Sequence, residues 1–139
     1  MKKPLRILVC GSRHWGNYNR IRAVISLLHN EQGIACVIHG CCPTGADMIA
    51  DNVAITLGIP TKRYPADWKK HGKAAGPLRN QQMLDEGKPD LVLAFTNTPE
   101  TSRGTKDMTT RAKKANLEVR SYTDHCLTNW LPQRKQPDV

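Results

Sequence analysis

Short apolar runs alternate with stretches of helical periodicity along residues 1–122. Apolar runs bounded by glycine or polar turns predict buried strands of a parallel sheet. Five segments fit this description, at residues 6–10, 35–39, 61–64, 91–95 and 117–122. The fourth has the clearest pattern, and the fifth is expected to be less buried.

Apolar residues at helical spacing predict a helix in each interval between these strands. The four helices are centred on residues 21–28, 46–57, 77–87 and 108–115. Gly33 is expected to close the first helix, and Pro77 to stand at the start of the third. The alternation predicts a single Rossmann-like α/β domain with three layers and a five-stranded, mainly parallel sheet.

A chain of 139 residues, 39% of them hydrophobic, is long enough for one core. We expect the domain over residues 1–122 and a loose polar tail over 123–139, with at most a short turn near 127–131. No apolar run approaches the roughly 20 residues of a membrane helix, and no signal peptide is evident, so we expect a cytoplasmic protein with no membrane partner. Five cysteines without a CxxC pair favour reduced thiols over disulfides or a zinc site.

The charge is strongly positive, because 21 Lys and Arg face 12 Asp and Glu for a net charge of +9. Much of the excess lies in residues 62–79. This segment indicates either a surface for an anionic partner or an ordinary solvated face.

The turns that follow the strands are the places where an open parallel sheet binds ligands. Two of them, at residues 40–47 and 96–105, contain glycines and lead into helices. Glycine lets backbone N–H groups approach a phosphate, and the helix dipole favours the negative charge. No P-loop or GxGxxG motif is present, so the sequence does not support an ordinary ATPase or dinucleotide dehydrogenase, and we expect no resident cofactor or metal.

Two arginines are placed to bind phosphate at this edge. Arg13 directly follows the glycine that ends the first strand, and Arg79 lies in the first turn of the third helix. Trp68 could stack on a base or cap the core. The basic loop at residues 71–76 could close over an anion or remain solvated.

These motifs resemble those of the YspA group, in the YpsA-related SLOG family. The resemblance runs from about residue 7 to residue 122 and rests on GSR at 11–13, HG at 39–40, GAD at 45–47, YPADW at 64–68, HGKAAGP at 71–77, RN at 79–80 and GT at 104–105. It implies a Rossmann-like domain that binds nucleotides or nucleotide-derived ligands, and homodimers or larger homo-oligomers. Relatives include the LOG phosphoribohydrolases, the DNA-processing protein A fold, and bacterial antiviral sensors of NAD-derived signals.

The chain departs from the LOG signature where that signature carries its catalytic glutamate. Met108 stands at the glutamate position, Thr101 and Ser102 replace two glycines, and Asn80 replaces a lysine. Cleavage of an N-glycosidic bond normally needs a carboxylate, which methionine cannot supply. The resemblance therefore supports nucleotide binding more than hydrolysis.

Three functions remain open. The first is a sensor or sequestering protein for a nucleotide or a nucleotide-derived ligand, for example an ADP-ribose-like molecule. The second is a nucleoside-phosphate glycoside hydrolase that uses Asp47, Asp67 and Arg79, although Asp47 could equally cap its helix. The third, ranked last, is a nucleic-acid-binding protein. The candidate ligand-binding residues are Gly11, Ser12, Arg13, Gly40, Thr44, Gly45, Asp47, Asp67, Trp68, Lys73, Arg79, Asn80, Phe95, Gly104 and Thr105.

Overall fold

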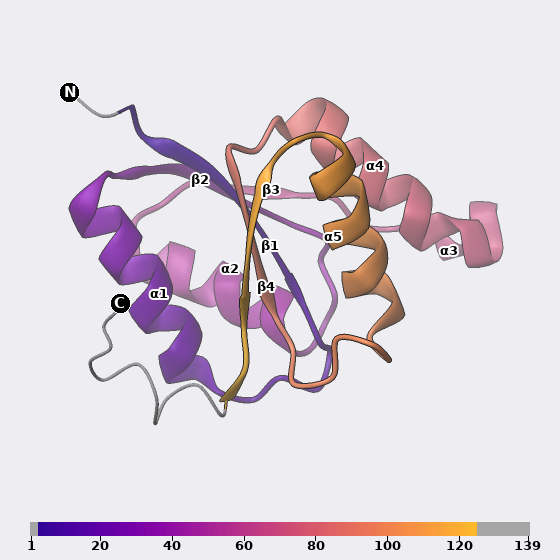
Figure 1. Cartoon of the computed structure of the whole chain (residues 1–139), viewed down its shortest axis with the longest axis horizontal. Coiled ribbons are helices and arrows are strands. Elements are labelled where there is room, and N and C mark those ends of the chain that lie inside the picture. Colours follow the sequence, from indigo (N-terminus) through magenta and orange to yellow (C-terminus); the bar gives the residue numbers. More distant parts are fainter. Residues whose placement is uncertain (1–2, 125–139) are drawn as a thin grey trace.

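The computed structural model describes residues 3–124, which form a five-stranded sheet covered by helices on both faces (Figure 1). The strands are β1 (Leu5–Gly11), β2 (Ile34–His39), β3 (Thr61–Arg63), β4 (Leu91–Phe95) and β5 (Glu118–Tyr122). All neighbouring strands are parallel, in the order β3-β2-β1-β4-β5. This confirms the Rossmann-like α/β class.

The helices are α1 (Tyr18–Glu31), α2 (Ala46–Leu57), the short α3 (Trp68–His71), α4 (Ala75–Gly87) and α5 (Arg103–Lys114), with a 3₁₀ turn, η1 (Gly72–Ala74), before α4. α1 and α2 cover one face of the sheet, and α4 and α5 cover the other (Figure 1). The order in which successive strands are added to the sheet reverses at β1, because β2 and β3 lie on one side of it and β4 and β5 on the other. Ligands of such sheets bind outside the carboxyl ends of the strands at this reversal.

Successive side chains of β1 point to opposite faces of the sheet and pack in two separate cores. Ile7 and Val9 face the α1 and α2 layer, whereas Leu8 and Cys10 face α4 and α5. Phe95 closes the first core at the carboxyl edge, with its ring 5.6 Å from that of Trp15 and 5.0 Å from that of Tyr122. β5 is an edge strand with mostly exposed side chains, as its polar sequence predicts.

The structure differs from the sequence prediction in three features of the helices. α4 begins at Ala75, so Pro77 is its third residue. Proline fits there because the first N–H groups of a helix have no partner within it. Residues 71–76, expected as a loop, complete α3, form η1 and begin α4. Ala115, expected on a buried helix face, is the exposed residue that ends α5.

The tail prediction falls almost wholly outside the described residues, as does the predicted turn at 127–131. Asp124, at the end of the described chain, accepts hydrogen bonds from Asn17 (2.9 Å) and Asn97 (3.0 Å). No helix within residues 3–124 is long and apolar enough to cross a membrane.

Candidate functional site

A cleft of about 510 Å³ opens at the carboxyl edge of the sheet, beside β1. Its volume falls within the roughly 300–1,000 Å³ of small-ligand sites. Side chains and backbone from four segments line it: Val9, Cys10, Gly11, Ser12, Arg13, His14, Gly40, Cys42, Asp47, Arg79, Asn80, Met83, Thr98, Thr101, Ser102, Arg103, Gly104 and Thr105. The cleft thus brings together nine of the predicted ligand-binding residues.

One wall of the cleft is the turn between β2 and α2, and its amides are directed at a carboxylate of the same chain. Cys42 donates its N–H to Oδ2 of Asp47 (3.2 Å), and the backbone of Gly40 also hydrogen-bonds this carboxyl. Gly45 precedes α2 with φ of +78°, and Ala46 donates its N–H to the carbonyl of Ser12 (3.1 Å). This turn therefore carries its own anion.

Asp47 is 8% exposed, and it is the only acidic residue among the described residues that line the cleft. Burial raises the pKa of its carboxyl, against the lowering effect of the Cys42 amide and of the nearby Arg79 charge. Its position in the first turn of α2 is favourable for a negative charge. A buried carboxylate held by backbone amides presents its remaining lone pairs to the cleft as hydrogen-bond acceptors.

Arg79 contributes a half-buried positive charge to the same wall. Its Nη1 donates to the carbonyls of Gly40 and, at 3.4 Å, of Tyr64, while its Nε donates to Oδ1 of Asn80 (3.0 Å). These bonds fix the guanidinium against the β2–α2 turn. A Cβ at Gly40 would overlap the guanidinium of Arg79, so any larger residue here would displace that side chain.

The opposite wall is the N-terminus of α5, and it is open. Ser102 is the N-cap residue, but its hydroxyl hydrogen-bonds Oγ1 of Thr96 (2.8 Å) and caps no helix amide. Within the described residues, the N–H groups of Arg103, Gly104 and Thr105 have no acceptor. A Cβ at Gly104 would meet no atom within 4 Å.

Arg13 lies on the rim between the two walls and is exposed. Its backbone is held in place because Ser12 donates its N–H to the Phe95 carbonyl (2.9 Å) and Thr44 donates its hydroxyl to the Arg13 carbonyl (2.9 Å). The guanidinium itself has no hydrogen-bond or ion-pair partner in the part of the chain that the structure describes. It is free to bind an anion in the cleft.

Six predicted ligand-binding residues do not line the cleft. Thr44 and Gly45 lie behind the rim and support the backbone of Arg13. Phe95 is wholly buried in the core, so its ring cannot contact a ligand without rearrangement. Phe95 ends β4 and therefore lies at the carboxyl edge of the sheet, but its side chain packs toward the α1 layer.

The other three belong to the basic segment before α4. Asp67 caps α3 by accepting the N–H of Lys70 (3.1 Å), and Lys73 is exposed in η1. Trp68 is 58% exposed, with its ring against Gly76. The indole does not cap the core, which was one of its two predicted roles.

Several lining residues escaped the sequence prediction, and periodicity could have found some of them. Cys10 precedes Gly11 at the end of β1, and Met83 lies one helical turn after Arg79 and Asn80. Thr98 and Thr101 belong to an irregular loop, for which the sequence pattern holds no signal.

A second hollow of about 520 Å³ lies between α4 and α5, near their C-terminal ends. Asp107, on its wall, accepts hydrogen bonds from Arg111 (2.8 Å) and Asn80 (2.9 Å). This hollow is lined by two acids and three basic side chains, whereas the cleft beside β1 is lined by one acid and three arginines, so the cleft is the better candidate for an anionic ligand.

Comparison with known proteins identifies the family of this chain. The family described as YspA, cpYpsA-related SLOG matches residues 5–71. The chain is also 35% identical over 125 residues to the Gene 61 protein of Mycobacterium phage D29, which covers 86% of this chain and 97% of that protein. The chain belongs to the YspA, cpYpsA-related SLOG family. Membership of the SLOG family favours a nucleotide-related function.

The matched residues of this SLOG protein contain β1, the β2–α2 turn and α3, but not α4 or α5. The open wall of the cleft therefore lies outside the family match. Met108, which the resemblance to the LOG signature places at its glutamate position, is 1% exposed and packs in the core between α5 and the sheet. No carboxylate enters the cleft from this turn of α5.

Proposed function

We propose that the cleft binds a nucleotide or a nucleotide-derived ligand, such as a nucleoside monophosphate or an ADP-ribose-like molecule, and that the protein senses or sequesters it. The observation that carries this proposal is that one cleft combines two groups suited to an anion. These are the N-terminus of α5, which has no side-chain cap, and the guanidinium of Arg13, which has no partner among residues 3–124.

The phosphate is assigned to the α5 wall. Amides at a helix N-terminus bind phosphate through hydrogen bonds and the helix dipole. The β2–α2 turn is less suitable, because its Cys42 amide already binds Asp47 and its Ala46 amide binds Ser12. A phosphate at Gly104 and Thr105 would also lie on the wall opposite Asp47, which avoids repulsion between the two anions.

The sugar is assigned to the Asp47 wall. A carboxylate that accepts from the vicinal hydroxyls of ribose is a common means of nucleotide recognition in Rossmann-like sites. Asp47 is fixed by backbone amides and faces the cleft, so it is pre-organised for such bonds. A ribonucleotide should therefore bind better than its 2′-deoxy analogue.

The base is assigned to the α4 side. Gly76, Arg79, Asn80 and Met83 follow the i, i+3, i+4, i+7 spacing of one helix face, and the last three line the cleft. The exposed ring of Trp68 covers Gly76 and continues this face. A base that extends along α4 would meet the indole, with Lys73 nearby in the chain to bind a further phosphate.

Binding is preferred to hydrolysis because of how the acids are placed. Asp67 caps α3 outside the cleft lining, and Asp47 is engaged by the β2–α2 turn. Incubation with nucleoside monophosphates, NAD and ADP-ribose should release neither base nor ribose phosphate. Turnover that is lost in Asp47→Asn would instead support the hydrolase.

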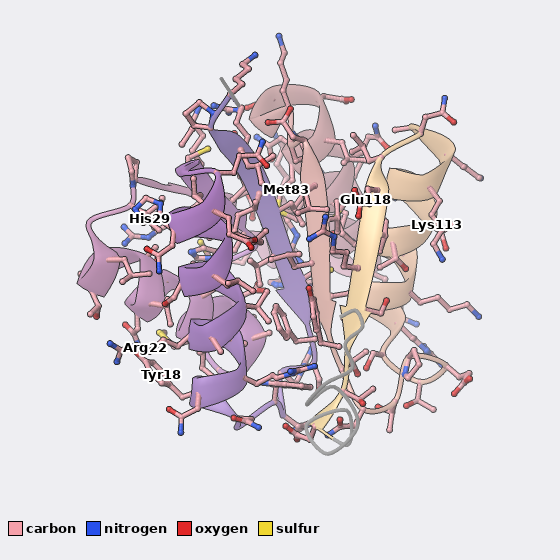
Figure 2. All side chains as sticks on the ribbon, turned by 60° about the vertical axis from the view of Figure 1, so that its left-hand side comes forward. Tyr18, Arg22, His29, Met83, Lys113 and Glu118 are labelled. Atoms are coloured by element: carbon pink, nitrogen blue, oxygen red, sulfur yellow. The ribbon has the colours of Figure 1, made fainter. Side chains whose placement is uncertain are left out.

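The binding test is calorimetric titration of the protein with nucleoside 5′-monophosphates and with the corresponding nucleosides. Removing one charged phosphate contact typically weakens binding by about 10-fold or more. Arg13→Ala should therefore weaken binding of the monophosphate and leave the nucleoside almost unaffected. Arg22→Ala is the matched control, because Arg22 points outward from α1 (Figure 2).

Small molecules released from the purified, denatured protein should be identified by mass spectrometry in parallel. A nucleotide present in the parent and absent from Arg13→Ala would name the ligand. Equal binding of monophosphate and nucleoside by the parent would contradict the phosphate assignment.

A further inference from the structure

A buried histidine stands behind the β2–α2 turn, outside the cleft lining. His39 is the last residue of β2 and is 3% exposed. Its Nδ1 accepts the N–H of Cys41 at 3.1 Å. Because Nδ1 is the acceptor, the ring proton of the neutral imidazole is on Nε2, which donates to Oδ1 of Asp51 at 2.8 Å.

The outer end of this chain of contacts is an arginine on the edge strand. Arg63, on β3, donates its Nε and Nη2 to the two carboxylate oxygens of Asp51, at 2.9 and 3.1 Å. Burial opposes ionisation of Asp51, but the hydrogen bonds from Arg63 and His39 outweigh it and hold the pKa of Asp51 below its usual range. The charged carboxylate fixes the orientation and tautomer of the imidazole.

The inner end is the turn that carries the candidate sugar-binding group. Cys41 has φ of +61°, a left-handed conformation that is uncommon for a residue with a side chain. Its N–H points back to His39, while Gly40 and Cys42 use their backbone to hold Asp47. The carbonyl of Gly40 also accepts from Arg79. The hydrogen bond from the Cys41 amide to the imidazole thus lies in the middle of the turn that holds both Asp47 and Arg79.

We infer that His39 is a positioning residue: through its bond to the Cys41 amide it holds the β2–α2 turn in the conformation that presents Asp47 and Arg79 to the ligand. The inference rests on the proposed function for its effect on binding. The effect of His39 on the conformation of the β2–α2 turn can be tested without ligand.

Two substitutions separate the contact of His39 with Cys41 from its contact with Asp51. In His39→Asn, the side-chain oxygen can accept the N–H two residues later in an Asx-turn, so the bond to Cys41 is kept and that to Asp51 is lost. In His39→Gln, the longer amide reaches toward Asp51 but is poorly placed for Cys41. A residue that merely fills space would tolerate both changes equally or neither.

The first measurement is hydrogen exchange of the Cys41 and Cys42 amides in the ligand-free protein, followed by NMR. Loss of one hydrogen bond of ordinary strength should speed exchange by about 5- to 10-fold or more in His39→Gln, with rates close to the parent in His39→Asn. Amides of β4 serve as the internal control for global stability. Equal rates in the two variants, relative to β4, would overturn the inference.

The second measurement is the affinity ratio between a ribonucleoside 5′-monophosphate and its 2′-deoxy analogue. His39→Gln should lower the ratio about 5-fold, whereas His39→Asn should preserve it. If the parent binds neither nucleotide, the proposed function fails, and the exchange rates still decide the role of His39. If the parent discriminates and both variants do so equally, the positioning role is wrong while the proposed function stands.

Discussion

The two glycine-containing turns at the carboxyl edge look alike in sequence and differ in what they hold. Both follow a buried strand and lead into a helix. The β2–α2 turn directs its amides to Asp47, so its anion site is filled from within the chain. The α5 turn directs its Ser102 hydroxyl to Thr96, and its first amides have no acceptor within the described part of the chain. A glycine turn before a helix therefore indicates an anion site only when the chain itself leaves the amides free.

The largest effect should come from blocking the open turn. Gly104 faces free space in the cleft, so the indole of Gly104→Trp would occupy the place assigned to the phosphate. Nucleoside monophosphate affinity should fall by about 100-fold or more, because both the amides and the helix dipole become inaccessible. Calorimetric titration measures the loss.

The control for this substitution is Gly16→Trp. Gly16 also faces open space but does not line the cleft. It should bind the nucleotide like the parent, and both variants should have parent-like urea midpoints. Parent-like affinity in Gly104→Trp would remove the phosphate from the α5 turn.

The sequence was sufficient for the sheet because each strand is decided by local pattern. Leu91–Phe95 is apolar throughout, and its strand could be read directly. The sequence also placed Arg13, Arg79 and Gly104 at one edge, because parallel strands put their following turns together. The sequence could not show the difference between the two turns, because that difference depends on hydrogen bonds that form only in the folded chain, such as the one between the Ser102 and Thr96 hydroxyls. Nor could it show that Phe95 is buried at the end of its strand, because that burial depends on packing between elements.

Alanine at the two glycines should change stability in opposite directions. Gly45 has φ of +78°, and a Cβ there would fall on the backbone of Ser12 and Arg13. Strain and overlap of this kind should lower the free energy of unfolding by about 2–4 kcal/mol. Gly104→Ala replaces glycine in a helix without a clash and should raise it by up to about 1 kcal/mol. Urea unfolding of the two variants side by side tests this; a loss of stability in both would mean that the α5 turn is not open.

Ser102→Asp would make the second turn resemble the first. A carboxylate at the N-cap can accept from the free amides of α5, which should stabilise the helix by about 0.5–1 kcal/mol. The same carboxylate competes with phosphate, so nucleotide affinity should fall by about 10-fold.

Ser102→Asn separates capping from charge, because asparagine caps as well as aspartate but is neutral. It should weaken binding less than Ser102→Asp, and added salt should narrow the gap between them. If the two variants bind equally well, repulsion of the ligand plays no part and the site is not specific for an anion.

The effect expected from Asp47→Asn is on stability, and its size depends on pH. Burial raises the pKa of Asp47, so the folded state binds the proton more tightly than the unfolded state. The stabilisation from protonated Asp47 is present below the usual carboxyl pKa and is lost as pH rises through the raised value. Asp47→Asn should therefore raise the free energy of unfolding by about 1 kcal/mol at pH 7, with the gain vanishing in acid.

Asp107→Asn provides the opposite case on α5. Burial opposes ionisation of Asp107, but hydrogen bonds from Arg111 and Asn80 outweigh it and lower the pKa. Its stabilisation is present above the usual carboxyl pKa and is lost as pH falls through the lowered value, so Asp107→Asn should destabilise the protein at pH 7. Urea unfolding at pH 7 and pH 4 distinguishes the two acids. If both substitutions change the free energy of unfolding in the same direction at pH 7, the charged Asp47 does not destabilise the fold. The idea that Asp47 serves ligand binding at a cost in stability would then be wrong.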